Sequence, residues 1–207
     1  PADRMLRFCL ACRNPRAMAL RTNPSSRLWI LAALLLVASK SFAQKRNNHV
    51  VLQDGFPDQT GTHISFASES PIDLGQLPLG YGECSAAISD TAGNFQFATV
   101  NGDVFDRFGA LMDQGDLFMG LTGDATQGCL IFPRPGAQDL YDVVYIRDTP
   151  FTSPVIQASW VTVDMTLNSG LGAVVSNTIF GQQFTEKLTG TPHGNATDYW
   201  ALMHEWG

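Results

Sequence analysis

Four histidines are the residues of this chain that could most directly bind a metal ion or transfer a proton near neutral pH. They are His49, His63, His193 and His204. Their spacing matches neither H-x3-H nor H-E-x-x-H, the patterns that place two histidines on one metal ion. His204 and Glu205 come closest, but the residues around them have the pattern of a strand rather than a helix. We interpret them as a polar pair at a strand edge and predict no metal site and no cofactor.

Acidic residues gather in a glycine-rich stretch between residues 112 and 126. Asp113, Asp116 and Asp124 could contribute oxygen ligands to Ca2+, which takes about six to eight of them. The stretch does not have the spacing of an EF-hand loop. We therefore predict that it is an exposed, solvated connection.

Asp90 lies in a cluster of turn residues, 89–94, between two apolar runs. The Asp-box turn of sialidase-type propellers needs Ser, Asp and Gly at alternate positions, and Ser89, Asp90 and Gly93 do not have that spacing. An aspartate side chain in a turn commonly accepts hydrogen bonds from nearby backbone N–H groups. We predict that Asp90 caps the turn in this way.

Charge divides the chain into two unlike parts. Residues 1–43 contain 7 basic and 1 acidic residue, a net charge of +6, and the remaining residues contain 6 basic and 18 acidic residues, a net charge of −12. An acidic domain without a basic patch is a poor partner for nucleic acid or for an anionic membrane. We predict that the chain binds neither.

Residues 18–43 have the pattern of an export signal. Met18 precedes Arg21 and Arg27, an apolar run follows at 28–38, and Ser41-Phe42-Ala43 supplies a small-x-small cleavage site. The run is shorter than the about 20 residues that a membrane-spanning helix needs. We predict cleavage after Ala43, a secreted or cell-surface location, and no membrane span in the mature chain.

Residues 1–17 precede this signal, and we interpret them as an upstream segment without a fold. Cys9 and Cys12 form a C-x2-C pair there. A zinc site of that type needs a second pair nearby, which the sequence lacks. We therefore predict no role for these cysteines in the mature domain.

After residue 43 the sequence predicts an all-β protein made of hairpins. Three pairs of short apolar runs are separated by turn residues: 84–88 with 95–100, 128–132 with 140–145, and 187–189 with 199–203. Further strands are expected at 63–68, 104–107, 157–165 and 173–175. The polar residues before the second strands, Asn94, Asp139 and Asp198, are 45 (139 − 94) and 59 (198 − 139) residues apart. Such steps are near the length of a propeller blade.

We therefore expect residues 44–207 to be a fragment of a β-propeller with about three blade-like hairpin units. The sequence from 199 to 206 is still apolar and strand-like where the chain ends. We expect the domain to be incomplete there, with the last strand as an unpaired edge that waits for the remaining blades.

Cys84 and Cys129 are also 45 residues apart (129 − 84), like the first two hairpins. Equivalent positions in successive blades point in the same direction, and packed sheets lie about 10 Å apart. A disulfide needs Cα atoms within about 7 Å. The same register in the third hairpin contains Leu188, an ordinary core residue. We predict that both thiols are buried and free.

Four blocks of this sequence, taken in order, resemble the N-terminal propeller-like region of large secreted proteins from Bacteroidota-type bacteria. The blocks are 84–97, 126–141, 163–174 and 186–200. The resemblance implies a WD40-like propeller completed by further blades, often followed by adhesion modules and a sorting domain for type IX secretion. It carries no catalytic residue over to this chain.

From these observations we predict a non-enzymatic interaction domain of a larger secreted or cell-surface protein. Its role would be adhesion, scaffolding or the carriage of other domains, with a surface protein or a glycan as partner. The alternative is part of a secreted propeller hydrolase that acts on polysaccharide or peptide at a central channel, with a second catalytic carboxylate in a blade outside this sequence.

Overall fold

The computed structural model describes residues 5–9, 45–53, 60–80, 82–117, 125–147 and 156–205. Within these ranges, regular structure consists of strands and of two short 3-10 helices, η1 (Lys45–Asn47) and η2 (Asn168–Gly170). No helix in the described ranges is long and apolar enough to cross a membrane.

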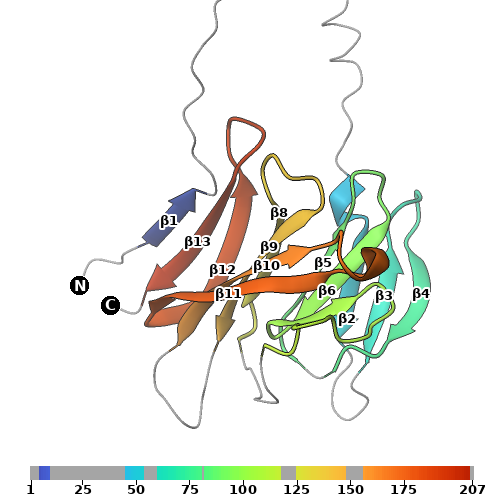
Figure 1. Ribbon diagram of the computed structural model, residues 1–207, viewed down its shortest axis with the longest axis horizontal. Coiled ribbons are helices and arrows are strands. Elements are labelled where there is room, and N and C mark those ends of the chain that lie inside the picture. Colours follow the sequence, from blue (N-terminus) through green and yellow to red (C-terminus); the bar gives the residue numbers. More distant parts are fainter. Residues whose placement is uncertain are drawn as a thin grey trace, which may run out of the picture.

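The strands form four small antiparallel sheets, which confirms the all-β class (Figure 1). Their orders are β2-β3-β4, β5-β6-β7, β8-β9-β10-β11 and β12-β13-β1. The strands are β1 (Met5–Cys9), β2 (His49–Gln53), β3 (Gly61–Ser65), β4 (Ile72–Leu77), β5 (Ser85–Ser89), β6 (Phe95–Val100), β7 (Asp103–Asp106), β8 (Cys129–Pro133), β9 (Leu140–Arg147), β10 (Gln157–Asp164), β11 (Ala173–Gln182), β12 (Phe184–Pro192) and β13 (Tyr199–Glu205).

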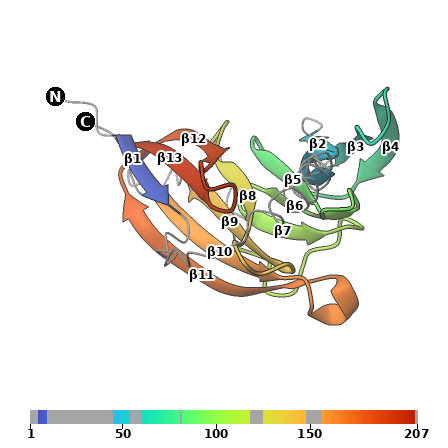
Figure 2. The ribbon, with the colours of Figure 1, turned by 90° about the horizontal axis from the view of Figure 1, so that it is seen from above.

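The four sheets follow one another along a curve, with β11 on its outer side (Figure 2). The first strands of neighbouring sheets contact each other in turn: β2 with β5, β5 with β8, and β8 with β12. Each pair of neighbouring sheets encloses its own apolar cluster. The core is therefore divided into three layers between sheets.

Strand β9 shows how the sequence produces this layering. Successive side chains of a strand point to opposite faces of its sheet. Val143 and Tyr145 accordingly pack toward the β5-β6-β7 sheet, while Val144 and Ile146 pack toward the β12-β13 sheet. All four are almost fully buried. A strand that is covered on both faces has a continuous run of apolar residues, and β9 has such a run.

All three predicted hairpins are present as antiparallel pairs, β5 with β6, β8 with β9, and β12 with β13. The further strands predicted at 63–68, 104–107, 157–165 and 173–175 correspond to β3, β7, β10 and β11. Sequence reasoning missed β2 and β4. Strand β4 is exposed along nearly its whole length and contains Gly75 at a positive φ, so it has no apolar alternation to detect.

Residues 5–9, which we expected to have no fold, form a strand in the full chain. Residues 5–9 form β1, which pairs antiparallel with β13 from Met5 opposite His204 to Cys9 opposite Trp200. β1 therefore covers the outer edge of β13 in the full chain. The predicted unpaired edge concerns the chain cleaved after Ala43, which lacks β1, and it stays a prediction. Pairing at a sheet edge uses backbone N–H and C=O groups, so it needs no side-chain pattern that a sequence would reveal.

The predicted role of Asp90 is confirmed. Its Oδ1 accepts hydrogen bonds from the backbone N–H groups of Ala92 and Asn94, both at 2.9 Å, and its Oδ2 accepts one from Asn94 Nδ2 at 2.8 Å. Partial burial works against the charged form, but these hydrogen bonds outweigh it and hold the pKa of Asp90 below its usual value. The charged carboxylate therefore stabilises the turn between β5 and β6.

Replacing Asp90 with alanine is expected to lower the free energy of unfolding by about 1 kcal/mol at neutral pH, because three hydrogen bonds are lost in a half-exposed turn. Since the pKa is lower in the folded state, the contribution is complete above the unfolded value of about 3.9 and disappears as the pH falls through the folded pKa. Urea unfolding at neutral and acid pH measures both effects. The exposed Glu69→Ala variant is the control. An equal difference between wild type and Asp90→Ala at both pH values would contradict the role of the charge.

Candidate functional site

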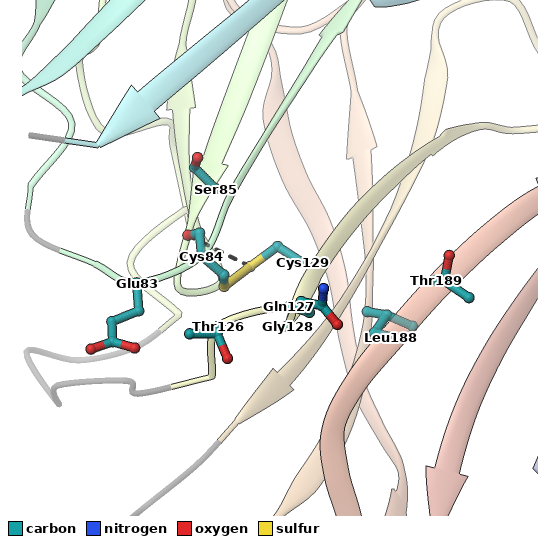
Figure 3. A pocket seen from close by; sticks show the side chains of 9 residues that line it. All are labelled: Glu83, Cys84, Ser85, Thr126, Gln127, Gly128, Cys129, Leu188 and Thr189. Atoms are coloured by element: carbon teal, nitrogen blue, oxygen red, sulfur yellow. Dashed lines mark hydrogen bonds between the residues drawn. A yellow bond between two sulfur atoms is a disulfide. The ribbon is translucent and has the colours of Figure 1, made fainter.

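The first strands of three sheets line one polar cavity of about 430 Å3 (Figure 3). Glu83, Cys84 and Ser85 reach it from the start of β5, residues 126–129 from the start of β8, and Leu188 and Thr189 from β12. These segments meet because the first strands of neighbouring sheets lie side by side. We call this space the polar cavity.

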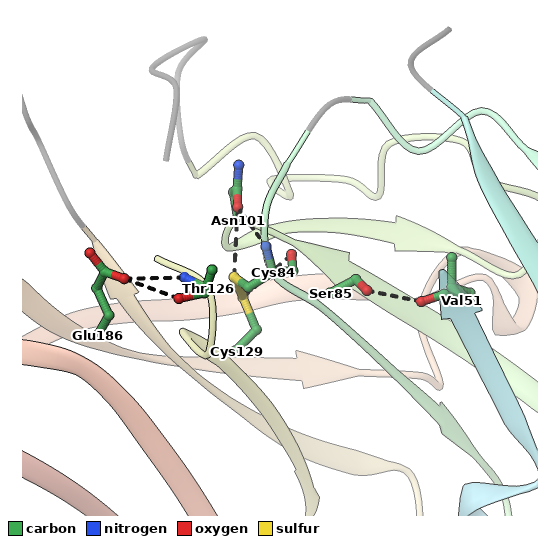
Figure 4. Close-up of a disulfide and its surroundings, with 7 residues drawn as sticks. All are labelled: Val51, Cys84, Ser85, Asn101, Thr126, Cys129 and Glu186. Atoms are coloured by element: carbon green, nitrogen blue, oxygen red, sulfur yellow. Dashed lines mark hydrogen bonds between the residues drawn. A yellow bond between two sulfur atoms is a disulfide. The ribbon is translucent and has the colours of Figure 1, made fainter. Parts of the chain in front are cut away.

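A disulfide between Cys84 and Cys129 joins two walls of the polar cavity (Figures 3 and 4). The two Cα atoms are 6.0 Å apart, within the bridging range. Both cysteines are buried, as predicted, but the prediction that they are free was wrong. The disulfide links the β5-β6-β7 sheet to the β8-β9-β10-β11 sheet.

The error in the cysteine prediction was one residue of register. Ser85 pairs with Val100 and Cys129 pairs with Tyr145, so Cys129 is equivalent to Ser85 rather than to Cys84. The difference arises from the irregularity in the β5-β6 pairing at Ile88 and Ser89, which the β8-β9 pairing lacks. A shift of one residue turns a side chain to the opposite face of a strand. The two cysteines therefore face each other instead of pointing the same way.

Asn101 holds the first wall of the polar cavity in place. It forms the turn between β6 and β7 with Gly102, and both residues have positive φ values, 51° and 100°. This Asn-Gly turn is typical of a two-residue hairpin. Asn101 Oδ1 accepts a hydrogen bond from Cys84 N at 3.3 Å (Figure 4). The turn thus fixes the backbone at the half-cystine.

Two further hydrogen bonds connect the walls to neighbouring sheets (Figure 4). Ser85 Oγ donates to Val51 O of β2 at 2.9 Å, and Thr126 Oγ1 donates to Glu186 Oε2 of β12 at 3.1 Å. The walls of the polar cavity are therefore hydrogen-bonded to a backbone carbonyl of β2 and to a side chain of β12. Hydroxyl, amide and carboxylate groups of its lining can exchange hydrogen bonds with a polar ligand.

The structure brings two of the four histidines together. His49 Nδ1 and His63 Nε2 are 2.8 Å apart, and His49 Nε2 donates to Gly93 O at 3.2 Å. Phe95 packs against His63, with ring centroids 4.5 Å apart. Burial, and then the charge of His49, lower the pKa of His63. The pair ties the β2-β3-β4 sheet to the turn between β5 and β6.

Sequence spacing could not show the histidine pair because it depends on strand β2, which was not predicted. Val51 is opposite His63 in the β2-β3 pairing, so His49, two residues before Val51, is a diagonal neighbour of His63 on the same face of the sheet. His193 lies against Trp200, and His204 is on β13, where a strand was predicted. Among the described residues, no three His, Cys, Asp or Glu side chains gather closely enough to hold a metal ion.

The acidic stretch differs from the predicted solvated loop where the structure describes it. Met112 is buried, its N–H donates to Val104 O, and Gly115 O accepts from Val104 N. Residues 112–117 thus pack against β7. Asp113 and Asp116 are exposed there, while Asp124 lies outside the described residues.

Comparison of the chain with models of known protein families, with curated proteins and with solved structures finds no match. Its function is therefore argued from its own residues.

Proposed function

We propose that this chain is an exported, non-enzymatic interaction domain of propeller type, part of a larger secreted or cell-surface protein, and that its polar cavity is the binding site. The observation that carries the proposal is the polar cavity itself, lined by the first strands of three sheets and by the two cysteines of a disulfide. The partner we propose is a surface protein or a glycan, because the lining offers hydroxyl, amide and carboxylate groups.

The Cys84–Cys129 disulfide supports the proposed location. Structural disulfides form and persist in oxidising compartments such as the bacterial periplasm and the cell exterior, and are rare in the cytosol. The apolar run at 28–38 and the small residues before Gln44 supply a route to that compartment.

The arrangement of the sheets supports the proposed propeller type. In a propeller, small antiparallel sheets pack face to face around an axis, with their first strands innermost. Here four sheets of three or four strands follow one another in chain order, and their first strands contact in turn. A ligand in the polar cavity would contact residues from three sheets at once.

The proposal is tested by export and by binding. Expressed with a C-terminal tag in a bacterium with an intact export pathway, the chain is expected in the periplasm or medium, with an N-terminus at or within a few residues of Gln44. A mature N-terminus upstream of Leu28 would contradict export.

Binding is tested on arrays of glycans and purified surface proteins. Thr189→Trp places a bulky ring at the rim of the polar cavity and is expected to abolish binding, whereas Thr178→Trp on the exposed part of β11 is expected to leave it unchanged. Equal binding by the two variants would exclude the polar cavity as the site. Hydrolysis of an arrayed glycan or peptide would exclude a non-enzymatic role.

A further inference from the structure

A second cavity, of about 320 Å3, lies along the same first strands and is apolar where the polar cavity is not. Its walls include Ile88 of β5, Leu130 and Phe132 of β8, Pro192 of β12 and Tyr199 of β13. We call it the apolar groove. Its lining is suited to an aliphatic or aromatic group, because such a group loses contact with water when it enters.

One basic side chain, Arg46 of η1, stands at the apolar groove. Its guanidinium carbon is 5.8 Å from the centroid of the Tyr141 ring, and Nη1 donates a long hydrogen bond of 3.4 Å to the Tyr141 hydroxyl. Its Nε is buried without a hydrogen-bond partner. Among the described residues, a salt bridge joins Arg134 and Asp142. Arg46 has no carboxylate partner among them.

The charge of Arg46 acts on two tyrosines, Tyr141 and Tyr199. Burial raises the pKa of Tyr141 and of Tyr199, and in both cases the positive charge of Arg46 opposes the rise. Geometry agrees: Arg46 Nη1 is 3.4 Å from the Tyr141 hydroxyl, and Arg46 and Tyr199 both line the apolar groove. Asp90 and Asp139 act on Tyr141 in the opposite direction. In the part of the chain that the structure describes, the apolar groove thus has one cation, Arg46, in its lining and no carboxylate.

We propose that the apolar groove binds a small amphipathic monocarboxylate, whose carboxylate accepts hydrogen bonds from Arg46 and whose apolar chain lies along β5, β8 and β12. Guanidinium groups match carboxylates in a two-pronged geometry, and Arg46 lines the groove without a carboxylate partner among the described residues. This proposal goes beyond the proposed function and does not depend on it.

The test is calorimetric titration of the full chain with decanoate, decanol and decyltrimethylammonium at neutral pH. Decanoate is expected to bind at least about tenfold more tightly than either analogue, because only its head group can pair with a guanidinium. Equal affinity for decanoate and decanol would overturn the proposal, as would no binding of decanoate.

Variants locate the site. Arg46→Gln is expected to weaken decanoate binding at least about tenfold. Lys187→Gln removes the same charge from an exposed position of β12 outside the apolar groove and is expected to have no effect. Thr191→Trp, at an exposed position of the groove lining, blocks the path of the decanoate alkyl chain. This variant is expected to abolish binding, and it tests the site even if Arg46→Gln fails to fold. Unchanged binding by Thr191→Trp would place the decanoate elsewhere and overturn the proposal.

Discussion

Replacing Cys84 and Cys129 with alanine is expected to lower the free energy of unfolding by about 2–4 kcal/mol, since the disulfide closes a loop with a sequence separation of 45 residues. The cross-link limits the conformations of the unfolded chain and joins the β5-β6-β7 sheet to the β8-β9-β10-β11 sheet. For a chain of this size, the midpoint of thermal unfolding should fall by about 5–15 °C.

Thermal unfolding with and without reductant measures the effect. Reductant is expected to lower the midpoint of the wild type to that of the double variant, and to leave the double variant unchanged, which controls for effects on Cys9 and Cys12. Peptide mass spectrometry without reduction should find residues 84 and 129 cross-linked. A reductant-insensitive wild type would show that the two thiols are free.

Replacing Arg134 with methionine is expected to destabilise the protein by about 3 kcal/mol. Asp142 of β9 is 3% exposed and accepts hydrogen bonds from Arg134 Nε at 3.1 Å, from Arg134 Nη2, and from Trp160 Nε1 at 3.0 Å. The hydrogen bond to Asp142 raises the pKa of Arg134. Removing the cation leaves a buried carboxylate without its counter-charge, which costs more than the lost contacts alone. Arg134 itself is one-third exposed, so the expected loss is at the lower end of the range for buried pairs.

A second substitution separates charge from packing. Asp142→Asn combined with Arg134→Met should recover part of the stability, because a neutral amide does not need the guanidinium. Lys187→Met, at an exposed cation of β12, is expected to change stability by less than about 0.5 kcal/mol. Urea unfolding of the four proteins measures these differences. A double variant less stable than Arg134→Met alone would contradict the role of the unpaired charge.

Local features of this fold could be predicted from the sequence. Strand pairs such as β5 with β6 follow from short apolar runs on either side of turn residues, and the Asp90 turn follows from the hydrogen-bonding habits of aspartate. The burial of Leu188 was also predicted and is confirmed. These features depend on residues that are close together in the chain, and their side-chain types carry the information.

Features that depend on distant residues could not be predicted in the same way. The edge of β13 is covered by β1 through backbone groups, which every residue type offers. Arg46 contacts Tyr141 across a separation of 95 residues. The residues next to either one in the sequence do not indicate this contact. The histidine pair needs the β2-β3 register, and β2 alternates too weakly to be recognised.

The sequence by itself determined the all-β class, the three hairpins and the burial of Cys84 and Cys129. Only the tertiary structure decided that these cysteines face each other. One irregularity in the β5-β6 pairing changes the register by one residue, and in a strand that change reverses the direction of a side chain. The same packing brings the starts of β5 and β8 and the middle of β12 together, and so creates a cavity that none of the three strands contains alone.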